Sequence, residues 1–205
     1  MANPRRIFEP DGIYHVASRG SDRRPIFRSD ADRELFLDQL EKTLERYRLP
    51  CIAYCLMGNH YHLIVLTPDQ RLSKAMQELN GGYSRRFNSI HDRSAHLFRN
   101  RFMAQSIDSD SYLLTACRYV AHNPVRAGLC LTPAAWRWSS YRATVGIDQT
   151  RRFIDERLLR DLLRGGERWL DRYREFVEVD GPVAPPPGHK KLGSAEAAAA
   201  ARYSC

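Results

Sequence analysis

The sequence of 205 residues predicts an α+β fold built on an antiparallel β-sheet. Two runs rich in β-branched and aromatic residues, 51–56 and 60–66, flank Gly58-Asn59, which is typical of a β-hairpin. Apolar residues at helical spacing over 30–48 and 72–90 predict two amphipathic helices. No apolar stretch approaches membrane-spanning length, so these elements are expected to share one soluble core.

Further strands complete a recognisable order. Residues 13–18 alternate loosely between polar and apolar side chains and predict the first strand. Ser29 or Asp30 caps the first helix, and Pro50 ends it. After the hairpin and the second helix, residues 99–107 predict a fourth strand. The order strand, helix, strand, strand, helix, strand predicts a ferredoxin-like sheet (βαββαβ) with helices on one face.

A third helix is expected to begin at Asp108 or Ser109 and to end before Pro124. On a helical wheel its apolar residues cluster on one side, whereas Tyr119 and Asn123 lie together on the other. This position argues against a core tyrosine and makes Tyr119 a candidate for chemistry.

Beyond residue 128 the sequence predicts accessory structure. The aromatic segment 136–141 is expected to pack on the sheet or on the third helix. We expect residues 10–145 to form the main domain and 146–180 a helical extension. Residues 181–205, rich in proline and then alanine, are expected to be a disordered tail.

The charge distribution indicates a polyanionic partner. The net charge is +8, and 28 of the 32 basic residues are arginine. Residues 1–152 hold 23 basic and 15 acidic residues, whereas 153–205 hold nine of each. Arginine matches phosphate oxygens and stacks on bases, which favours nucleic acid, although a codon bias toward arginine explains the composition equally well. Five cysteines without framework spacing indicate reduced thiols. Residues 1–6 contain no apolar run typical of a signal peptide, so we expect a cytoplasmic, nucleoid-associated protein.

His60 and His62 are the first candidate site. Strand periodicity places both imidazoles on one face, where they hold a metal ion if a third ligand arrives from another element. The competing interpretation is a pair of half-buried polar residues. Imidazole ligands by themselves favour zinc or a late transition metal.

Several blocks resemble the HUH-type single-tyrosine transposases, and within them the REP-associated tyrosine transposases. They cover about residues 10 to 145 in order. The most specific is Tyr-Val-x-x-Asn-Pro-Val-Arg-Ala-Gly at 119–128. The matching runs are 14–16, 19–20, 26–27, 56–63, 83–88, 96–102, 118–129 and 136–141.

The sequence departs from the family pattern at four places. Gly58 stands where relatives often have proline, Ala95 where they have glycine, and Tyr61 where an aliphatic residue is commoner. Arg99-Asn100 replaces a Gln-Gly pair, a change that alters which DNA is expected to be recognised.

The resemblance implies a metal-dependent single-stranded DNA endonuclease and strand transferase that acts on hairpin DNA of the repetitive extragenic palindrome (REP) type. Tyr119 would attack phosphorus and form a 5′-phosphotyrosine link, while His60, His62 and Asn123 would hold Mg²⁺ or Mn²⁺. DNA contacts are expected from a set of arginines: Arg19, Arg23, Arg24, Arg85, Arg86, Arg99, Arg101, Arg118 and Arg126.

Several alternatives stay open. Arg85 and Arg86 also fit a solvated helix face, and Arg118 and Arg126 fit a helix cap or an ion pair. We expect a hydrogen-bonding role for His122. His15 and His96 are expected to be structural.

Three hypotheses follow for the function. The first is the transposase chemistry just described, in a protein expected to be a monomer rather than a homodimer and not membrane-bound. The second is a domesticated protein that binds structured single-stranded DNA or RNA without turnover. The third, a zinc hydrolase, ranks last, because it leaves Tyr119 and the arginines unexplained.

Overall fold

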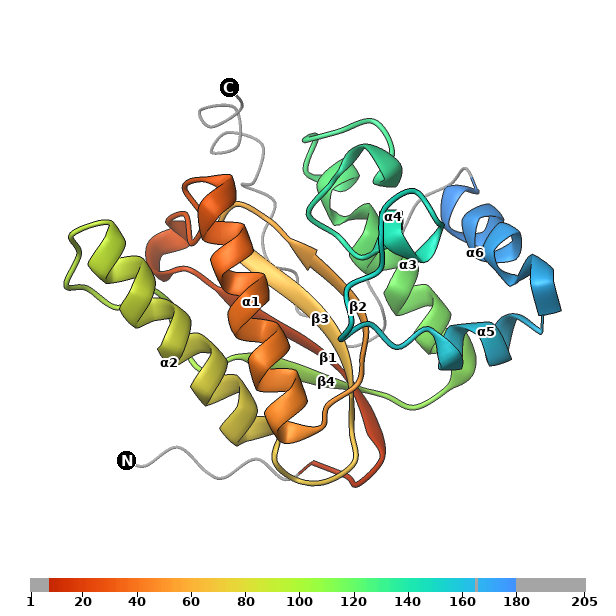
Figure 1. Cartoon of the computed structure of the whole chain (residues 1–205), viewed down its shortest axis with the longest axis horizontal. Helices are drawn as coiled ribbons and strands as arrows, with labels where there is room; N and C mark the ends of the chain where they lie inside the picture. The colour runs from red at the N-terminus through yellow and green to blue at the C-terminus, as the bar shows by residue number, and fades with distance from the viewer. Residues whose placement is uncertain (1–7, 165, 180–205) are drawn as a thin grey trace.

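A four-stranded antiparallel sheet forms the centre of the protein (Figure 1). The computed structural model describes residues 8–164 and 166–179. The strands are β1 Gly12–Arg19, β2 Cys51–Leu56, β3 His60–Thr67 and β4 Met103–Ile107, in the spatial order β2-β3-β1-β4. With the two helices that connect them, this order confirms the ferredoxin-like prediction.

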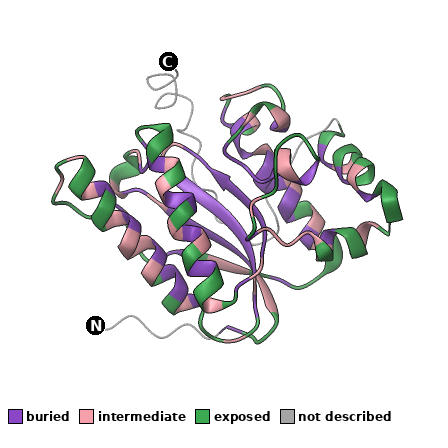
Figure 2. Cartoon of the chain, viewed as in Figure 1, coloured by how far each residue is buried: buried purple, intermediate pink, exposed green. Residues whose placement is uncertain are grey.

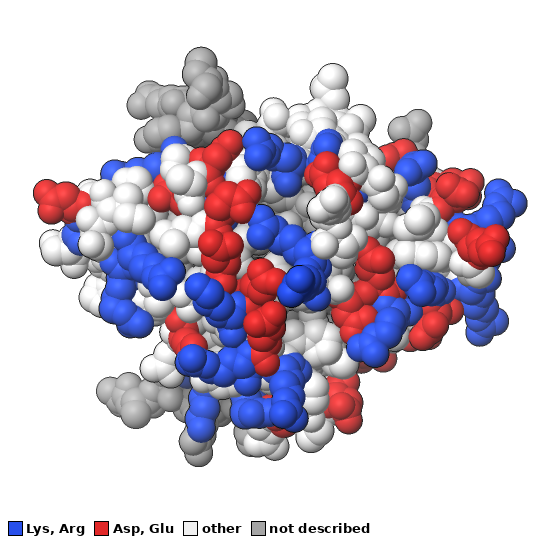
Figure 3. Space-filling model, viewed as in Figure 1, with Lys and Arg blue, Asp and Glu red and all other residues white. Residues whose placement is uncertain are grey.

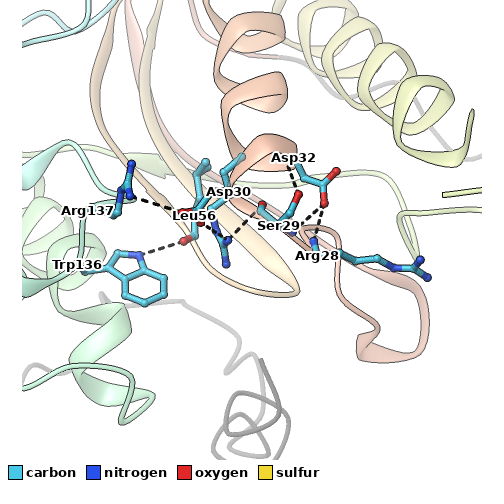
Figure 4. Close-up of polar contacts among 8 residues, drawn as sticks. Arg28, Ser29, Asp30, Asp32, Leu56, Trp136 and Arg137 are labelled. Atoms are coloured by element: carbon cyan, nitrogen blue, oxygen red, sulfur yellow. Dashed lines mark hydrogen bonds and ion pairs between the residues drawn. The ribbon is translucent and has the colours of Figure 1, made fainter. Parts of the chain in front are cut away.

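Helices α1 (Asp30–Tyr47) and α2 (Leu72–Ile90) cover one face of the sheet. Ser29 begins α1 with a capping box, in which its hydroxyl accepts from the Asp32 amide and the Asp32 carboxylate accepts from the Ser29 amide (Figure 4). The two helices approach closely at Gly82, where a Cβ would lie 3.1 Å from the Gln39 side chain. The helix sides that face the sheet are buried, and the outer sides are exposed (Figure 2).

Helix α3 (Asp110–Arg126) packs on the opposite face, with Ser109 as its N-cap. The prediction that this helix ends before Pro124 is wrong, because the helix continues for two residues beyond it. A proline in the last turn removes one backbone donor only, and the Ala127 amide still donates to the Asn123 carbonyl at 3.0 Å. Burial of Pro124 offsets that loss.

Short helices after α3 complete the second core. They are α4 (Tyr141–Thr144), α5 (Arg157–Leu163) and α6 (Trp169–Glu178). Among the described residues, 3₁₀ turns at Pro133–Ala135 and Gly166–Arg168 accompany these helices, and another at Ser21–Arg23 lies between β1 and α1. Leu159, Trp169, Tyr173 and Val177 share a buried cluster with α3, so the predicted extension lies against the helix that carries Tyr119. The predicted tail at 181–205 lies outside the described residues.

The aromatic segment 136–141 covers the outer edge of β2, as the sequence predicted for packing on the sheet. The Trp136 indole donates to the Leu56 carbonyl at 3.1 Å (Figure 4), and the Leu56 amide donates to the Trp138 carbonyl at 2.8 Å. The Ser140 amide donates to the Tyr54 carbonyl. An edge strand covered in this way is protected from pairing with another chain.

The fourth strand is shorter than the predicted 99–107. Upstream of Met103 the chain pairs with the segment after β1: the Ser21 amide donates to the Leu97 carbonyl at 2.9 Å, and the Arg99 amide to the Arg19 carbonyl at 3.0 Å. It then bends over residues 99–101 before β4 begins. The four cysteines among the described residues are free thiols, and no helix there is long and apolar enough to cross a membrane.

Candidate active site and nucleic-acid groove

Three imidazoles lie on the sheet face that α3 covers. His60 and His62 alternate along β3 and therefore share that face, with ring centroids 4.9 Å apart. His15 comes from β1, where it pairs with Ile64, and is a diagonal neighbour of His62. None of the three is more than 3% exposed.

Tyr119 extends from α3 toward the same place. Its ring centroid lies 6.0 Å from that of His62 and 6.0 Å from that of His15. The side chain is 4% exposed, so the expectation that Tyr119 lies off the buried face of its helix is wrong. A single apolar stripe did not describe α3, because the sheet covers one of its sides and α6 covers another.

Asn59 determines which nitrogen of His60 carries the proton. Its amide nitrogen donates to the Arg23 carbonyl at 3.1 Å, which turns its oxygen toward His60 Nδ1 at 2.7 Å. Because an amide oxygen only accepts, Nδ1 is the donor and Nε2 is the unprotonated nitrogen of the neutral ring. Burial, and next the charge of Arg19, lowers the pKa of His60 to about 3, so the ring is neutral near pH 7.

His62 has its own hydrogen-bonding partner, which the sequence analysis did not predict. His15 Nε2 lies 2.9 Å from His62 Nδ1, in a fully buried contact. This buried contact is consistent with the expected structural role of His15, although the sequence did not predict that it lies beside the candidate site. The alternation of side chains over residues 13–18 indicates on which face of the strand His15 lies. Only the register of β1 on β3 places it beside His62.

The donors present suit a divalent ion that keeps open coordination positions. In the described residues, no three His, Cys, Asp or Glu side chains converge as a closed metal cage. An ion at His60 and His62 would therefore accept further oxygen ligands from an amide, water or phosphate. Asn123 is 5% exposed, and its amide nitrogen donates to the Tyr119 carbonyl at 3.0 Å. Its role as third ligand stays a prediction.

The other polar residues of α3 have structural contacts. His122 Nε2 donates to the Val177 carbonyl at 2.7 Å, which confirms the predicted hydrogen-bonding role. Arg118 donates to the carbonyls of Val177 and Val179 at the end of α6, as expected of a helix cap. The Arg126 guanidinium lies 4.7 Å from the centroid of the Tyr119 ring, in a cation–π contact.

A basic groove lies between α2 and residues 94–102. Its volume is about 1080 Å³. Its charged lining consists of Lys74, Arg85, Arg99 and Arg101, without a carboxylate. The face crossed by α1, in contrast, mixes basic and acidic side chains (Figure 3). This composition favours an anionic polymer as the occupant of the groove.

The groove adjoins the imidazole site through backbone pairing. Its wall at residues 97–99 is hydrogen-bonded to the segment 19–21, and Arg19 is directly opposite His60 in the sheet. Arg23 and Arg24 are exposed in the turn that follows Arg19. Arg86 is exposed on α2, and the lining of the groove does not include it. Apart from Arg86, the predicted arginines thus divide between the groove, the rim of the site, and α3.

Comparisons with known proteins agree with this arrangement. Residues 10–123 match the family described as IS200-like transposases. A protein of Haemophilus influenzae, provisionally named a REP-associated tyrosine transposase, is 26% identical over 156 residues, which cover 71% of this chain and 88% of that protein.

A solved structure supports the same fold. It is a REP-associated tyrosine transposase bound to a REP hairpin, and it superposes with a TM-score of 0.67 over 95% of this chain and 100% of that chain, at 16% identity. The chain therefore belongs to the IS200-like transposases.

Proposed function

We propose that this transposase cleaves and rejoins hairpin DNA of the REP type through a covalent link to Tyr119, with a divalent ion at His60 and His62. The observation that carries the proposal is the 6.0 Å separation between the rings of Tyr119 and His62, beneath a helix that also carries Asn123. Tyr119 and the two histidines come from separate elements and lie together on one face of the sheet, as a nucleophile and metal ligands would.

In the proposed reaction, the Tyr119 phenolic oxygen attacks the scissile phosphorus. The bond to the 3′-oxygen breaks, the 5′-phosphate stays on Tyr119, and the 3′-oxygen takes up a proton as the phenol loses one. A divalent ion at this site, Mg²⁺ or Mn²⁺, would supply charge neutralisation on the phosphate oxygens, which favours attack by a weak nucleophile such as a phenol. His60, His62 and Asn123 would hold that ion, and Arg126, whose guanidinium lies beside the Tyr119 ring, would contact the phosphate. Attack by another 3′-hydroxyl reverses the step.

The basic groove holds the DNA next to this centre. Lys74, Arg85, Arg99 and Arg101 contact phosphates, and Arg99-Asn100 contributes to the choice of hairpin. Phe98, partly exposed in the same wall, offers a surface on which an unpaired base stacks. Arg19, Arg23 and Arg24 extend the contact along the rim toward His60.

Covalent capture tests the nucleophile. The protein is incubated with Mn²⁺ and a labelled hairpin that carries a single-stranded flank, taken from palindromic repeats near its gene. Wild type and Tyr112→Phe, a control on the same helix, should form a denaturation-resistant adduct that Tyr119→Phe does not form. An adduct in Tyr119→Phe rejects Tyr119. Tight binding by the wild type without any adduct supports instead a protein that binds hairpins without turnover.

Salt dependence tests the groove. Each lost phosphate contact should reduce the slope of log affinity against log salt concentration by about 1. Arg85→Gln should show this change, whereas Arg160→Gln, a substitution of a basic residue on α5, should keep the wild-type slope. Equal slopes for all three proteins would remove the groove from the DNA path.

A further inference from the structure

We propose that His15 is a positioning residue that accepts the Nδ1 proton of His62 and so keeps His62 Nε2 unprotonated for the metal ion. The inference rests on the proposed metal site and adds to it a residue that contacts neither the ion nor the DNA. In this proposal, the pairing of two strands determines which nitrogen of His62 carries the proton.

The contact between the two rings is built into the sheet. His15 and His62 come from the adjacent strands β1 and β3, and the backbone register fixes their relative position. Their facing nitrogens are 2.9 Å apart, and the side chains are 3% and 0% exposed. Water therefore does not compete for this contact, and the orientation of His62 depends on the partner that the sheet provides.

Proton counting selects one arrangement of this contact. Two neutral imidazole nitrogens at this distance share a single proton, which belongs to one ring or the other. If His15 donated, His62 Nδ1 would be the acceptor and its own proton would be on Nε2, so neither nitrogen could ligate a metal. If His62 donates from Nδ1, its Nε2 has a lone pair directed away from His15. Metal ligation by His62 requires this second arrangement, in which His15 Nε2 is the acceptor.

The neighbouring proposed ligand, His60, has the same protonation pattern but a different acceptor for its Nδ1 proton. His60 donates its Nδ1 proton to the amide oxygen of Asn59, and Nε2 is again the unprotonated nitrogen. The acceptor for His60 comes from the hairpin turn, whereas the acceptor for His62 comes from the next strand. Outer partners of this kind orient metal-bound histidines and raise their basicity.

The competing explanation is that His15 only fills space beneath α3. Two substitutions separate the explanations. In His15→Gln, the terminal amide oxygen occupies the region of the imidazole Nε2 and still accepts a proton. In His15→Phe, a ring of similar shape remains, but no acceptor does. If His15 only fills space, His15→Phe should be closer to wild type than His15→Gln. If His15 is a positioning residue, His15→Gln should be closer to wild type than His15→Phe.

Nitrogen NMR of histidine-labelled protein reads the protonation state of His62 directly, without metal or DNA. We expect the proton on Nδ1 in the wild type and in His15→Gln, and its displacement from Nδ1 in His15→Phe. A wild-type His62 with its proton on Nε2 would overturn the inference. So would an unchanged Nδ1–H form in a folded His15→Phe variant.

Binding of Mn²⁺ alone, measured by calorimetry, gives a second readout. His15→Phe should bind about 10- to 100-fold more weakly than wild type, with His15→Gln in between or equal to wild type. His122→Phe removes a histidine of α3 that donates to the Val177 carbonyl on α6, and it should leave the affinity unchanged. Equal affinities for wild type and His15→Phe would overturn the inference.

The two proposals fail in distinguishable ways. If His60→Ala and His62→Ala leave Mn²⁺ binding unchanged, the metal site itself is wrong. If those variants lose binding and His15→Phe does not, the site stands and His15 is structural. If the wild type binds no Mn²⁺ without DNA, the NMR measurement still decides the role of His15.

Discussion

The two faces of the sheet are equally buried but differ in chemistry. The face under α1 and α2 packs aromatic and aliphatic side chains around Phe36, which is 0% exposed. The polar atoms of that face are paired locally, as where the Tyr61 hydroxyl donates to Asn80 at 2.7 Å. The face under α3 instead buries three imidazoles together with Tyr119. One face therefore stabilises the fold, and the other gives up apolar packing to hold the polar groups of the candidate site.

The largest expected effect is on the α3 face. His60→Ala removes a proposed metal ligand, and a bound metal supplies several kcal/mol of transition-state stabilisation, so adduct formation should fall by about 10⁴-fold. Denaturing gels of reactions run with Mn²⁺ measure the yield of the covalent protein–DNA adduct. Thermal unfolding serves as the control, since the variant must be compared at a temperature where it is folded. Adduct formation within tenfold of wild type would contradict the division between the faces.

A substitution on the α1/α2 face should have the opposite effect, with a loss of stability and no loss of activity. Phe36 contacts the rings of Phe27, Tyr61 and Tyr83, so Phe36→Ala leaves a large cavity in the core. The free energy of unfolding should fall by about 3–5 kcal/mol, measured by urea denaturation. At a temperature where the variant is still folded, the adduct yield should equal that of the wild type. A selective loss of the adduct would show that the two faces are coupled.

The same division explains what the sequence could predict. On the α1/α2 face, residues 30–48 and 72–90 have one polar and one apolar side, and their periodicity predicted both helices closely. Helix α3 is buried on two sides, so a wheel with one apolar stripe placed Tyr119 wrongly, although the motif at 119–128 made it the candidate nucleophile. The periodicity of apolar residues therefore predicts the buried side of a helix correctly when the helix has only one such side.

The partners of the site residues depend on contacts that a linear pattern does not contain. His15 reaches His62 through the register of β1 on β3, and Asn59 is oriented by the Arg23 carbonyl, 36 residues away. The groove requires residues 94–102 to run beside α2, where the sequence predicted part of a strand. These features follow from tertiary packing, so only the structure could reveal them.

A smaller effect is expected at the turn that carries Asn59. Asn59→Ala removes the acceptor of His60 Nδ1, so Mn²⁺ affinity should fall by about 10- to 100-fold. Asn59→Asp keeps an oxygen that accepts this proton and should retain more of the affinity than Asn59→Ala. Calorimetry with Mn²⁺ compares the three proteins. If both substitutions reduce the affinity equally, the loop that includes the Arg23 contact matters more than the acceptor.

The smallest effect concerns a phenol on the α1/α2 face. Tyr54 packs against Phe153, and burial raises the pKa of its hydroxyl to about 12, with the charge of Arg151 acting in the opposite direction. In the unfolded chain the phenol ionises near pH 10, whereas in the fold it stays neutral, so the unfolded state loses its proton first as pH rises. Stability should therefore fall above pH 10, by about 1.4 kcal/mol per pH unit from this residue until the pH approaches 12.

Tyr54→Phe isolates this contribution. Urea denaturation of wild type and variant at pH 9 and pH 11 should show a loss that is about 1.4 kcal/mol smaller in the variant. Other buried phenols, such as Tyr61, whose pKa burial also raises, titrate in both proteins and cancel in the comparison. An equal loss in the two proteins would mean that Tyr54 ionises in the fold as readily as in the unfolded chain. The α1/α2 face would then tolerate a charged phenolate at Tyr54. Near the edge strand β2, this face would therefore not be a purely apolar, stabilising core.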